Sequence, residues 1–477
     1  MSYETVIGLE VHVELSTASK IFCSCETTFG GEPNTHCCPV CTGLPGALPV
    51  LNEQVVDYAI RTCLATHCAI TPLTRFDRKN YFYPDLPKAY QISQLHKPIG
   101  RNGFLEIETA EGPKRIGIHE IHMEEDAGKL IHDPWEDCTL VDYNRCGVPL
   151  LEIVSEPDLR SAEEALAYLE KLRSILQFLG VSDCRMEQGS LRADVNVSVR
   201  PVGSPTFGTR TEMKNMNSFK AIGRAIVAEA KRQIDLIEDG KTIKQETRRW
   251  DENKDSSFAM RSKEDAMDYR YFPDPDLVAV NITPEWIERV RSGLAELPES
   301  RRARYISDWQ LSEYEAGVLT THPAIANHFE QTATLSGRPK DAASWMLGEF
   351  MQAAKEQECE PQDLHMPAQS LATLIARVAE GVVNRNTAKK IFTQILENKV
   401  DPDAYIEQNG LRMVSNPDAL KDKIADIIAA NPQSIVDYKA GKTKAMGFLV
   451  GQVMRAMQGK ADPQLLNELL KDALEKV

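Results

Sequence analysis

Residues 8–15 place two glutamates and a histidine in alternation with apolar side chains. In a β-strand successive side chains point to opposite faces, so Glu10, His12 and Glu14 share one face and the apolar residues share the other. Two carboxylates and an imidazole on one face suit a divalent cation. A half-buried strand with a solvated charged face gives the same alternation. Carboxylates on further strands of the same sheet would favour a cation site over a solvated strand face.

Three later runs with strand periodicity carry such carboxylates. Residues 116–126 end in three consecutive acids, which repel one another unless a cation or solvent intervenes. Glu152 stands alone in an otherwise apolar strand, where it needs either a cation or a salt-bridge partner. Asp194 and Asn196 lie on the polar face of a third alternating run, 192–200, a pattern typical of the wall of a polar cleft.

Five of the eleven cysteines crowd between residues 23 and 41. We find no basic, apolar leader and no apolar run long enough to span a bilayer, so we expect a cytoplasmic protein with reduced thiols. Two close pairs of cysteines fit a tetrahedral zinc site, and four thiolates leave no open position, which favours a structural ion. His36 and Cys37 remain open as replacement ligands. The predicted ligands are Cys23, Cys25, Cys38 and Cys41.

Residues 75–91 interleave basic and aromatic side chains, and Lys79 and Lys88 belong to this segment. Its two prolines prevent a continuous helix, so the segment can combine phosphate contacts with stacking surfaces for a nucleotide or an RNA end. An aromatic loop that packs on the core with its lysines in solvent has the same composition. Lys214 precedes a helix predicted over about 218–240, and the N-terminus of a helix stabilises anions.

Strand alternation gives way to helical periodicity beyond about residue 298. The 477 residues exceed a single core, and a typical domain length indicates about three domains. We predict an α+β fold: a mixed or antiparallel sheet with helices over 1–293, a helical domain over 294–405 and a small helical tail over 406–477.

The net charge of −15 argues against nucleic-acid binding by the whole surface. A local basic patch can still bind RNA, and the lysines of 439–444 form such a patch. The same lysines could instead be a solvated lead-in to a helix.

With these motifs in order, the chain resembles the B subunits of the heterotrimeric aspartyl/glutamyl-tRNA amidotransferases, the GatB/GatE family. The likeness covers nearly the full length, and its last segment is similar to the YqeY-type tail of those proteins, which implies tRNA binding. The segments that carry it are 8–15, 76–91, 122–129, 149–158, 186–200, 214–219, 269–276 and 442–452.

The resemblance implies an ATP-dependent ligase that acts in two steps. The side-chain carboxylate of misacylated Glu-tRNA(Gln) or Asp-tRNA(Asn) is phosphorylated by ATP, and ammonia then displaces phosphate to give Gln-tRNA(Gln) or Asn-tRNA(Asn). The sequence shows no activated nucleophile for glutamine hydrolysis, so ammonia is expected from an amidase A subunit, with a small C subunit completing the heterotrimer. The alternative is a non-enzymatic, zinc-stapled RNA-binding protein with a structural acidic cluster.

The resemblance also assigns roles to residues in the predicted strands. Glu14 has no ligand role in the family pattern. The magnesium ligands would be His12, Glu125 and Glu152, followed by Glu10 and Asp194. The cofactor ATP would contact Glu10, Asp194, Asn196 and Lys214. The catalytic group would comprise Glu125, His12, Lys79 and Lys88, with the two lysines near the transfer site or the route of ammonia, which would emerge near Glu125.

Overall fold

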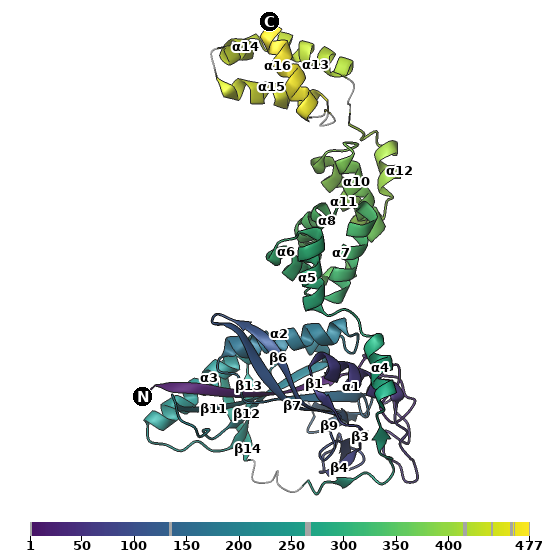
Figure 1. The fold of residues 1–477 in the computed structure, drawn as a ribbon, viewed down its shortest axis with the longest axis vertical. Coiled ribbons are helices and arrows are strands. Elements are labelled where there is room, and N and C mark those ends of the chain that lie inside the picture. Colours follow the sequence, from purple (N-terminus) through teal and green to yellow (C-terminus); the bar gives the residue numbers. More distant parts are fainter. Residues whose placement is uncertain are drawn as a thin grey trace. The chain divides into compact units, whose positions relative to one another are not determined.

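The chain divides into two compact units, Met1–Pro298 and Glu299–Val477, in the computed structural model of the protein (Figure 1). The first unit combines strands with helices and the second contains helices, which confirms the predicted α+β class. The predicted domain boundaries near 293 and 405 stay predictions. The structure describes every residue except 1, 133–135, 263–268, 414–416, 440–441, 458–460, 462 and 477.

A nine-stranded sheet is the framework of the first unit, in the order β14-β13-β12-β11-β1-β10-β7-β6-β2. β1 pairs antiparallel with β10 and β11, whereas β12 and β13 run parallel, so the sheet is mixed. Its strands are β1 (Tyr3–Glu14), β2 (Ala69–Ile70), β6 (Gly100–Thr109), β7 (Gly112–Glu125), β10 (Pro149–Ser155), β11 (Leu191–Pro201), β12 (Thr211–Lys214), β13 (Glu246–Asp251) and β14 (Ser256–Ser262).

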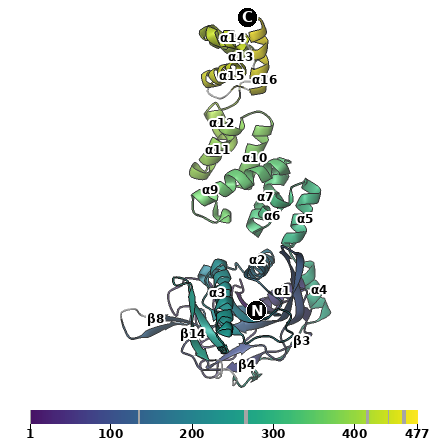
Figure 2. The ribbon, with the colours of Figure 1, turned by 90° about the vertical axis from the view of Figure 1, so that its left-hand side faces the viewer.

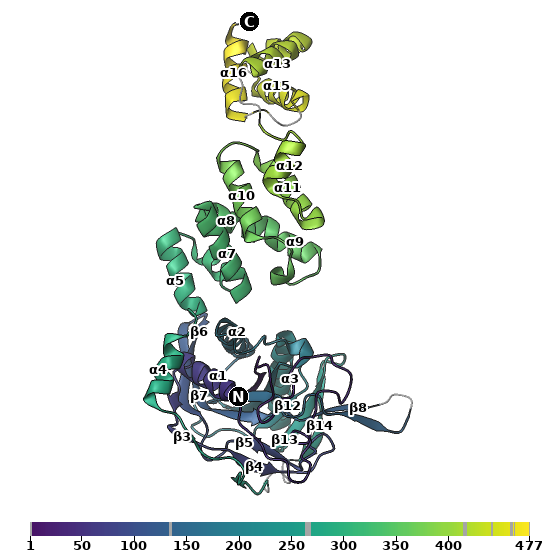
Figure 3. The same ribbon diagram turned by 90° about the vertical axis from the view of Figure 1, so that its right-hand side faces the viewer.

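One face of this sheet is apolar and is covered by helices. Leu9, Val11 and Val13 of β1 are at most 1% exposed and belong to one core with residues of the three longest helices of the first unit. Figures 2 and 3 show α2 above the sheet and β4 (Asp77–Asn80) below it. The polar side chains of the same strands therefore project away from the helices. These helices are α1 (Glu53–Ala65), α2 (Ala162–Phe178) and α3 (Phe219–Glu238).

Smaller elements complete the first unit. β4 lies between β15 and β5 in a three-stranded sheet, β16 pairs with β3, and β8 pairs with β9. Hydrogen bonds from Gln91 and Ile92 join β5 to Glu125 at the end of β7. The bounds of these elements are β3 (Leu73–Thr74), β5 (Tyr90–Ser93), β8 (Lys129–His132), β9 (Thr139–Asp142), β15 (Phe272–Pro273), β16 (Val280–Asn281), the 3-10 helix η1 (Met186–Gln188) and α4 (Pro284–Ser292).

The second unit holds two separate clusters of buried apolar residues. One gathers around Phe329, Trp345 and Ile375, and the other around Leu449 and Leu470. Among the described residues, no helix is long and apolar enough to cross a membrane. The predicted basic patch at 439–444 falls partly outside the described residues. The elements are α5 (Pro298–Trp309), α6 (Glu313–Leu319), α7 (Pro323–Ser336), α8 (Pro339–Trp345), the π-helix η3 (Met346–Phe350), α9 (Met351–Glu356), η4 (Pro361–Asp363), α10 (Ala368–Ala379), α11 (Arg385–Asn398), α12 (Pro402–Gln408), α13 (Pro417–Ala430), α14 (Pro432–Lys439), α15 (Thr443–Ala456) and α16 (Pro463–Lys476).

A candidate active site on the polar face of the sheet

Strand register brings polar residues from four strands into one row. His12 of β1 pairs directly with Glu152 of β10 and with Arg192 of β11, and Glu152 pairs with His122 of β7. Directly opposed residues of antiparallel strands project to the same face. The row of Arg192, His12, Glu152 and His122 therefore stands on the face that points away from the helices.

Two carboxylates converge on His12 in this row. We call His12, Glu124 and Glu152 the His12 cluster, because one ligand atom of each lies within 4.8 Å of the others. His12 Nε2 is 3.3 Å from Glu152 Oε2 and 3.8 Å from Glu124 Oε1. His122 Nε2 is 3.0 Å from the same Glu152 oxygen and 3.6 Å from Glu124 Oε2. The donor set of one imidazole and two carboxylates fits a divalent cation.

The two histidines balance the charge of these carboxylates. Burial, the largest single effect, disfavours a charged imidazole, but the hydrogen bond with Glu152 and the negative charges of Glu152 and Glu124 together raise the pKa of His12. Burial also opposes the charge of His122, yet the negative charge of Glu152 raises the pKa of His122 to about 10. Despite burial, the charge of His122 holds the pKa of Glu152 well below its ordinary range. A divalent cation at this cluster would therefore compete with protons.

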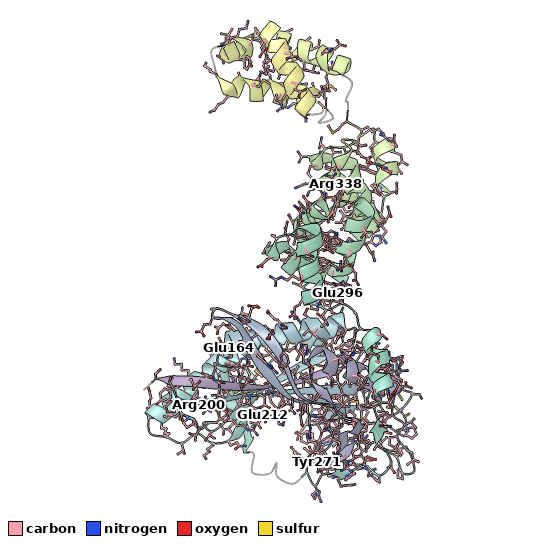
Figure 4. All side chains as sticks on the ribbon, viewed as in Figure 1. Glu164, Arg200, Glu212, Tyr271, Glu296 and Arg338 are labelled. Atoms are coloured by element: carbon pink, nitrogen blue, oxygen red, sulfur yellow. The ribbon has the colours of Figure 1, made fainter. Side chains whose placement is uncertain are left out.

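A second group of carboxylates lies two residues earlier on β1. We call Glu10, Asp194 and Glu212 the Glu10 cluster, because their ligand oxygens also lie within 4.8 Å of one another; Figure 4 labels Glu212 on β12. Lys214 Nζ donates to Asp194 and lies 3.2 Å from Glu212 Oε1. Asn196 Nδ2 donates to Glu10 Oε1 at 2.8 Å. Burial raises the pKa of Glu10, so a cation here would relieve an unfavourable concentration of negative charge.

Glu125, a predicted magnesium ligand, is not brought to the His12 cluster. Its carboxylate accepts hydrogen bonds from Lys88 Nζ and, at 2.9 Å, from the backbone N–H of Ile92 on β5. Successive residues of a strand point to opposite faces, so Glu124 lies beside His12 and Glu125 does not. The ion pair with Lys88 is buried, because the side chains are 7% and 2% exposed. The predicted catalytic residues Lys88 and Glu125 therefore form an ion pair with each other. This pair does not belong to the cluster that contains the predicted magnesium ligands His12 and Glu152.

Lys79 of β4 points its ammonium group toward aromatic rings. Its Nζ lies 5.0 Å from the ring centre of Tyr269 and 5.9 Å from that of Tyr81. Burial opposes the charge of Lys79, but Tyr271 and the negative charge of Glu124 raise its pKa. Figure 4 labels Tyr271 in this region. Lys79 thus lies in an aromatic environment within electrostatic reach of Glu124, a residue of the His12 cluster.

The four predicted zinc ligands are together. The sulfur atoms of all four residues lie within 4.8 Å of one another; the residues are Cys23, Cys25, Cys38 and Cys41. A hydrogen bond from Cys23 lowers the pKa of Cys41 to about 4, and the thiolate is the form that binds metal. Among the spare donors, His36 Nε2 lies 2.9 Å from Glu26 Oε1 and Cys37 Sγ bonds the Asn34 carbonyl oxygen at 3.2 Å. The geometry fits a metal held by the four predicted thiolates.

Two cavities adjoin these groups. One of about 420 Å³ opens beside the Glu10 cluster, and its lining includes Gly8, Glu10, Asn196 and Arg210. Another of about 240 Å³ has in its lining Lys88, Glu125 and Cys41, together with the turn that follows Cys41. The two cavities share no lining residue, so they adjoin different groups of predicted site residues.

Sequence reasoning missed four residues of the site: Glu124, His122, Glu212 and Arg192 as a partner of His12. The signal for the first two was present, since His122 and Glu124 are two residues apart in one alternating run. Glu212 lies in β12, which has four residues and is too short to show a period. The pairing of Arg192 with His12 depends on register, which a single strand pattern does not contain.

Two family models and several curated relatives match most of the chain. A family model described as the GatB/GatE catalytic domain matches residues 5–288, and one described as the GatB domain matches residues 327–474. The chain is similar to proteins named as the B subunits of aspartyl/glutamyl-tRNA(Asn/Gln) amidotransferases. The one from Lachnoclostridium phytofermentans is 61% identical over 474 residues, 99% of each chain. Those from Agathobacter rectalis (99% of this chain, 100% of the relative) and Caldicellulosiruptor saccharolyticus (100% of each) are 56% and 55% identical.

Proposed function

The chain belongs to the GatB/GatE family of tRNA-dependent amidotransferase subunits, and from this premise we propose that the polar face of its sheet activates the substrate carboxylate with ATP. Family membership supports the enzymatic prediction, a ligase of protein biosynthesis, over the non-enzymatic alternative. The observation that carries the proposal is the presence of two cation-type clusters at successive polar positions of one strand, Glu10 and His12.

The proposed substrate is Glu-tRNA(Gln) or Asp-tRNA(Asn), whose side-chain carboxylate is a poor electrophile. A carboxylate oxygen attacks the γ-phosphorus of ATP, the bond from that phosphorus to the bridging oxygen breaks, and ADP leaves. The nitrogen of ammonia then attacks the acyl carbon, and the carbon–oxygen bond to phosphate breaks. Inorganic phosphate leaves, a proton is lost from nitrogen, and Gln-tRNA(Gln) or Asn-tRNA(Asn) remains. Such phosphoryl transfer depends mainly on positioning and on electrostatic stabilisation.

Magnesium is the cation we propose for the two clusters. His12, Glu124 and Glu152 would hold one ion, and Glu10 and Asp194, with Glu212, would hold a second. When bound, the ions supply charge neutralisation of the phosphate oxygens. The carboxylate-rich donor sets suit this role.

The nucleotide would occupy the cavity of about 420 Å³ beside the Glu10 cluster. Arg210 lines this cavity and Lys214 contacts Asp194 of the cluster, so both can meet phosphate oxygens. Asn196 Oδ1 is buried and has no partner in the described part of the chain, which leaves an acceptor for a hydroxyl or amino group of the ligand.

Ammonia would reach the site past the buried pair of Lys88 and Glu125. This pair borders the cavity of about 240 Å³, which gives a small neutral molecule a space apart from the nucleotide cavity. An amidase A subunit would release the ammonia from glutamine, and a small C subunit would complete the complex. Lys79, within its aromatic surroundings, would lie near the point of transfer.

Two further parts of the chain would support the reaction. A structural zinc ion would hold the loop of Cys23, Cys25, Cys38 and Cys41 beside the ammonia cavity. The segment 75–91 would meet the acceptor end of the tRNA, since Phe82 is 84% exposed and Tyr83 is 51% exposed. The tail after about residue 405 would contact the body of the tRNA.

The experiment that tests this proposal measures ATP hydrolysis by the purified complex with magnesium. We expect hydrolysis with Glu-tRNA(Gln) or Asp-tRNA(Asn) and little with the same tRNA uncharged. Equal hydrolysis with charged and uncharged tRNA would contradict the proposal, and so would the absence of hydrolysis with the misacylated tRNA.

A further inference from the structure

A third group of charged residues lies at the end of β1, beyond the two clusters. Arg192 Nη2 donates to Asp126 Oδ2 at 2.6 Å, and Arg145 Nε lies 3.4 Å from the same oxygen. Asp126 Oδ1 accepts a hydrogen bond from the backbone N–H of Ala127 at 2.8 Å. Asp126 is 5% exposed, so its carboxylate holds the Arg192 guanidinium in a fixed place at the rim of the site.

Arg192 stands close to both clusters through the sheet register. It pairs with His12 across β1 and β11, and it precedes Asp194 of the Glu10 cluster by two residues on the same face of β11. Its side chain is 35% exposed, so a ligand can reach it. Its Nε–H is nonetheless buried and has no acceptor among the described residues. The described residues therefore leave part of the donor capacity of the guanidinium unused.

The groups follow one another along β1 in an order that suits in-line transfer. The nucleotide cavity reaches Val6 and Gly8, and the two clusters follow at Glu10 and His12. The charged group lies beside Glu14, which interacts with both Asp126 and Arg192. At about 3.4 Å per residue, the path from position 8 to position 14 is about 20 Å long. The attacking and leaving oxygens stand on opposite sides of the transferred phosphorus. With the nucleotide at the beginning of β1, the acceptor carboxylate belongs at its end.

We propose that Arg192 binds the side-chain carboxylate of the aminoacyl-tRNA, and that Asp126 positions the guanidinium for this contact. A guanidinium matches a carboxylate with two parallel hydrogen bonds, which a lysine does not offer. The face is otherwise rich in carboxylates, which would repel this substrate group. Asp126, the partner of Arg192, directly follows Glu125, the partner of Lys88, in the chain. The inference rests on the proposed function.

The test uses the complete complex with the changes Arg192→Gln and Arg192→Lys. We expect Arg192→Gln to lower kcat/KM for the misacylated tRNA by about 10- to 100-fold, the effect of losing a charged hydrogen bond. ATP affinity without tRNA should stay within about twofold, because Arg192 contacts the acceptor and not the nucleotide. Arg192→Lys keeps the charge beside Asp126, so it retains the fold, and its loss should be intermediate. Guanidinium ion in solution should restore part of the activity of Arg192→Gln.

A matched control is Arg200→Gln. Arg200 lies on the same face of β11, and Figure 4 labels it; its Nε donates to Glu4 Oε1 at 2.8 Å, away from both clusters. At saturating ATP its change should leave kcat/KM for the tRNA unaltered, because the Arg200 guanidinium contacts Glu4 and the ring of Phe207 and not the end of β1 where Asp126 lies. An unaltered kcat/KM in Arg192→Lys, or an equal loss of ATP affinity in Arg192→Gln, overturns the inference. Both of these outcomes are measured against an active wild-type complex. If the proposed function itself is wrong, the wild-type complex will show no tRNA-dependent ATP hydrolysis.

Discussion

Glu124 and Glu125 are neighbours with the same side chain, yet they have different surroundings. Glu124 Oε1 lies 3.8 Å from His12 Nε2, whereas the carboxylate of Glu125 accepts hydrogen bonds from Lys88 and the Ile92 backbone. The difference follows from the alternation of side chains along β7. The two residues are therefore a natural pair for separating cation binding from the handling of ammonia.

The change Glu124→Gln should weaken Mn²⁺ binding, measured by titration without substrates, by at least about tenfold, whereas Glu125→Gln should change it by less than about twofold. Glu125→Gln should instead lower amidation while tRNA binding is kept, because the Lys88 ammonium loses its buried counter-charge. Glutamine preserves the shape of each side chain, so each variant is the control for the other. The reverse order of the two Mn²⁺ affinities would contradict the assignment.

At the scale of elements, α3 is fixed to the sheet by a buried carboxylate. Glu229 of α3 accepts hydrogen bonds from Thr211 of β12 and from Arg232 and Gln233 of its own helix. Burial disfavours its charge, but the hydrogen bond from Arg232, followed by the others, lowers the pKa of Glu229 below its ordinary value of 4.5. The network holds β12, and with it Glu212, against β11.

This lowered pKa predicts a pH dependence of stability. A carboxyl group whose pKa is lower in the folded state adds stability above its unfolded value, and that stability is lost as the pH falls through the folded value. Glu229→Gln should lower the free energy of unfolding at neutral pH by about 1–3 kcal/mol. Its thermal midpoint should then fall less steeply below about pH 4.5 than that of the wild type. Glu238→Gln, an exposed change on the same helix, is the control; parallel pH curves for wild type and Glu229→Gln would count against the network.

The cysteine loop gives a second prediction at this scale. We expect about one zinc ion per chain in protein purified under reducing conditions, and a lower thermal midpoint after chelation. Cys38→Ser should reduce both the zinc content and the midpoint, because Cys38 belongs to the group of four sulfurs. Cys37→Ser should change neither, since Cys37 bonds the Asn34 carbonyl oxygen. Protein that contains no metal would refute the zinc site.

Some of these elements could be predicted from the sequence and others could not. The alternation of 8–15 predicted a strand and its polar face, and β1 (Tyr3–Glu14) has Glu10, His12 and Glu14 on that face. Helical periodicity predicted the helices after about residue 298. The pairing of β1 with β10 and β11 was not predictable, because it joins segments far apart in the chain. Glu125 was predicted as a ligand from the family resemblance, because three consecutive acids do not by themselves show which one shares the face of His12.

At the scale of the whole molecule, the second unit holds two clusters of buried residues, so the C-terminal one can be removed without cutting through the other. The cluster around Leu449 and Leu470 is built from α13, α15 and α16, with residues of α14 packed against it. A chain that ends at residue 413 removes this cluster as a whole and keeps Ile406 of the other one. We expect this truncation to weaken tRNA binding more than ATP binding, each measured on the purified complex. Equal losses of both would contradict a tRNA-binding tail.

The central claim is that the substrate carboxylate is phosphorylated before it is amidated, and an isotope experiment tests it most directly. The complex receives ATP, glutamine and Glu-tRNA(Gln) whose side-chain carboxylate carries heavy oxygen. Since the carbon–oxygen bond breaks in the second step, one heavy oxygen per turnover should appear in inorganic phosphate, detected by mass spectrometry. Amidation that leaves the inorganic phosphate unlabelled would contradict an acyl phosphate and, with it, the proposed role of the polar face.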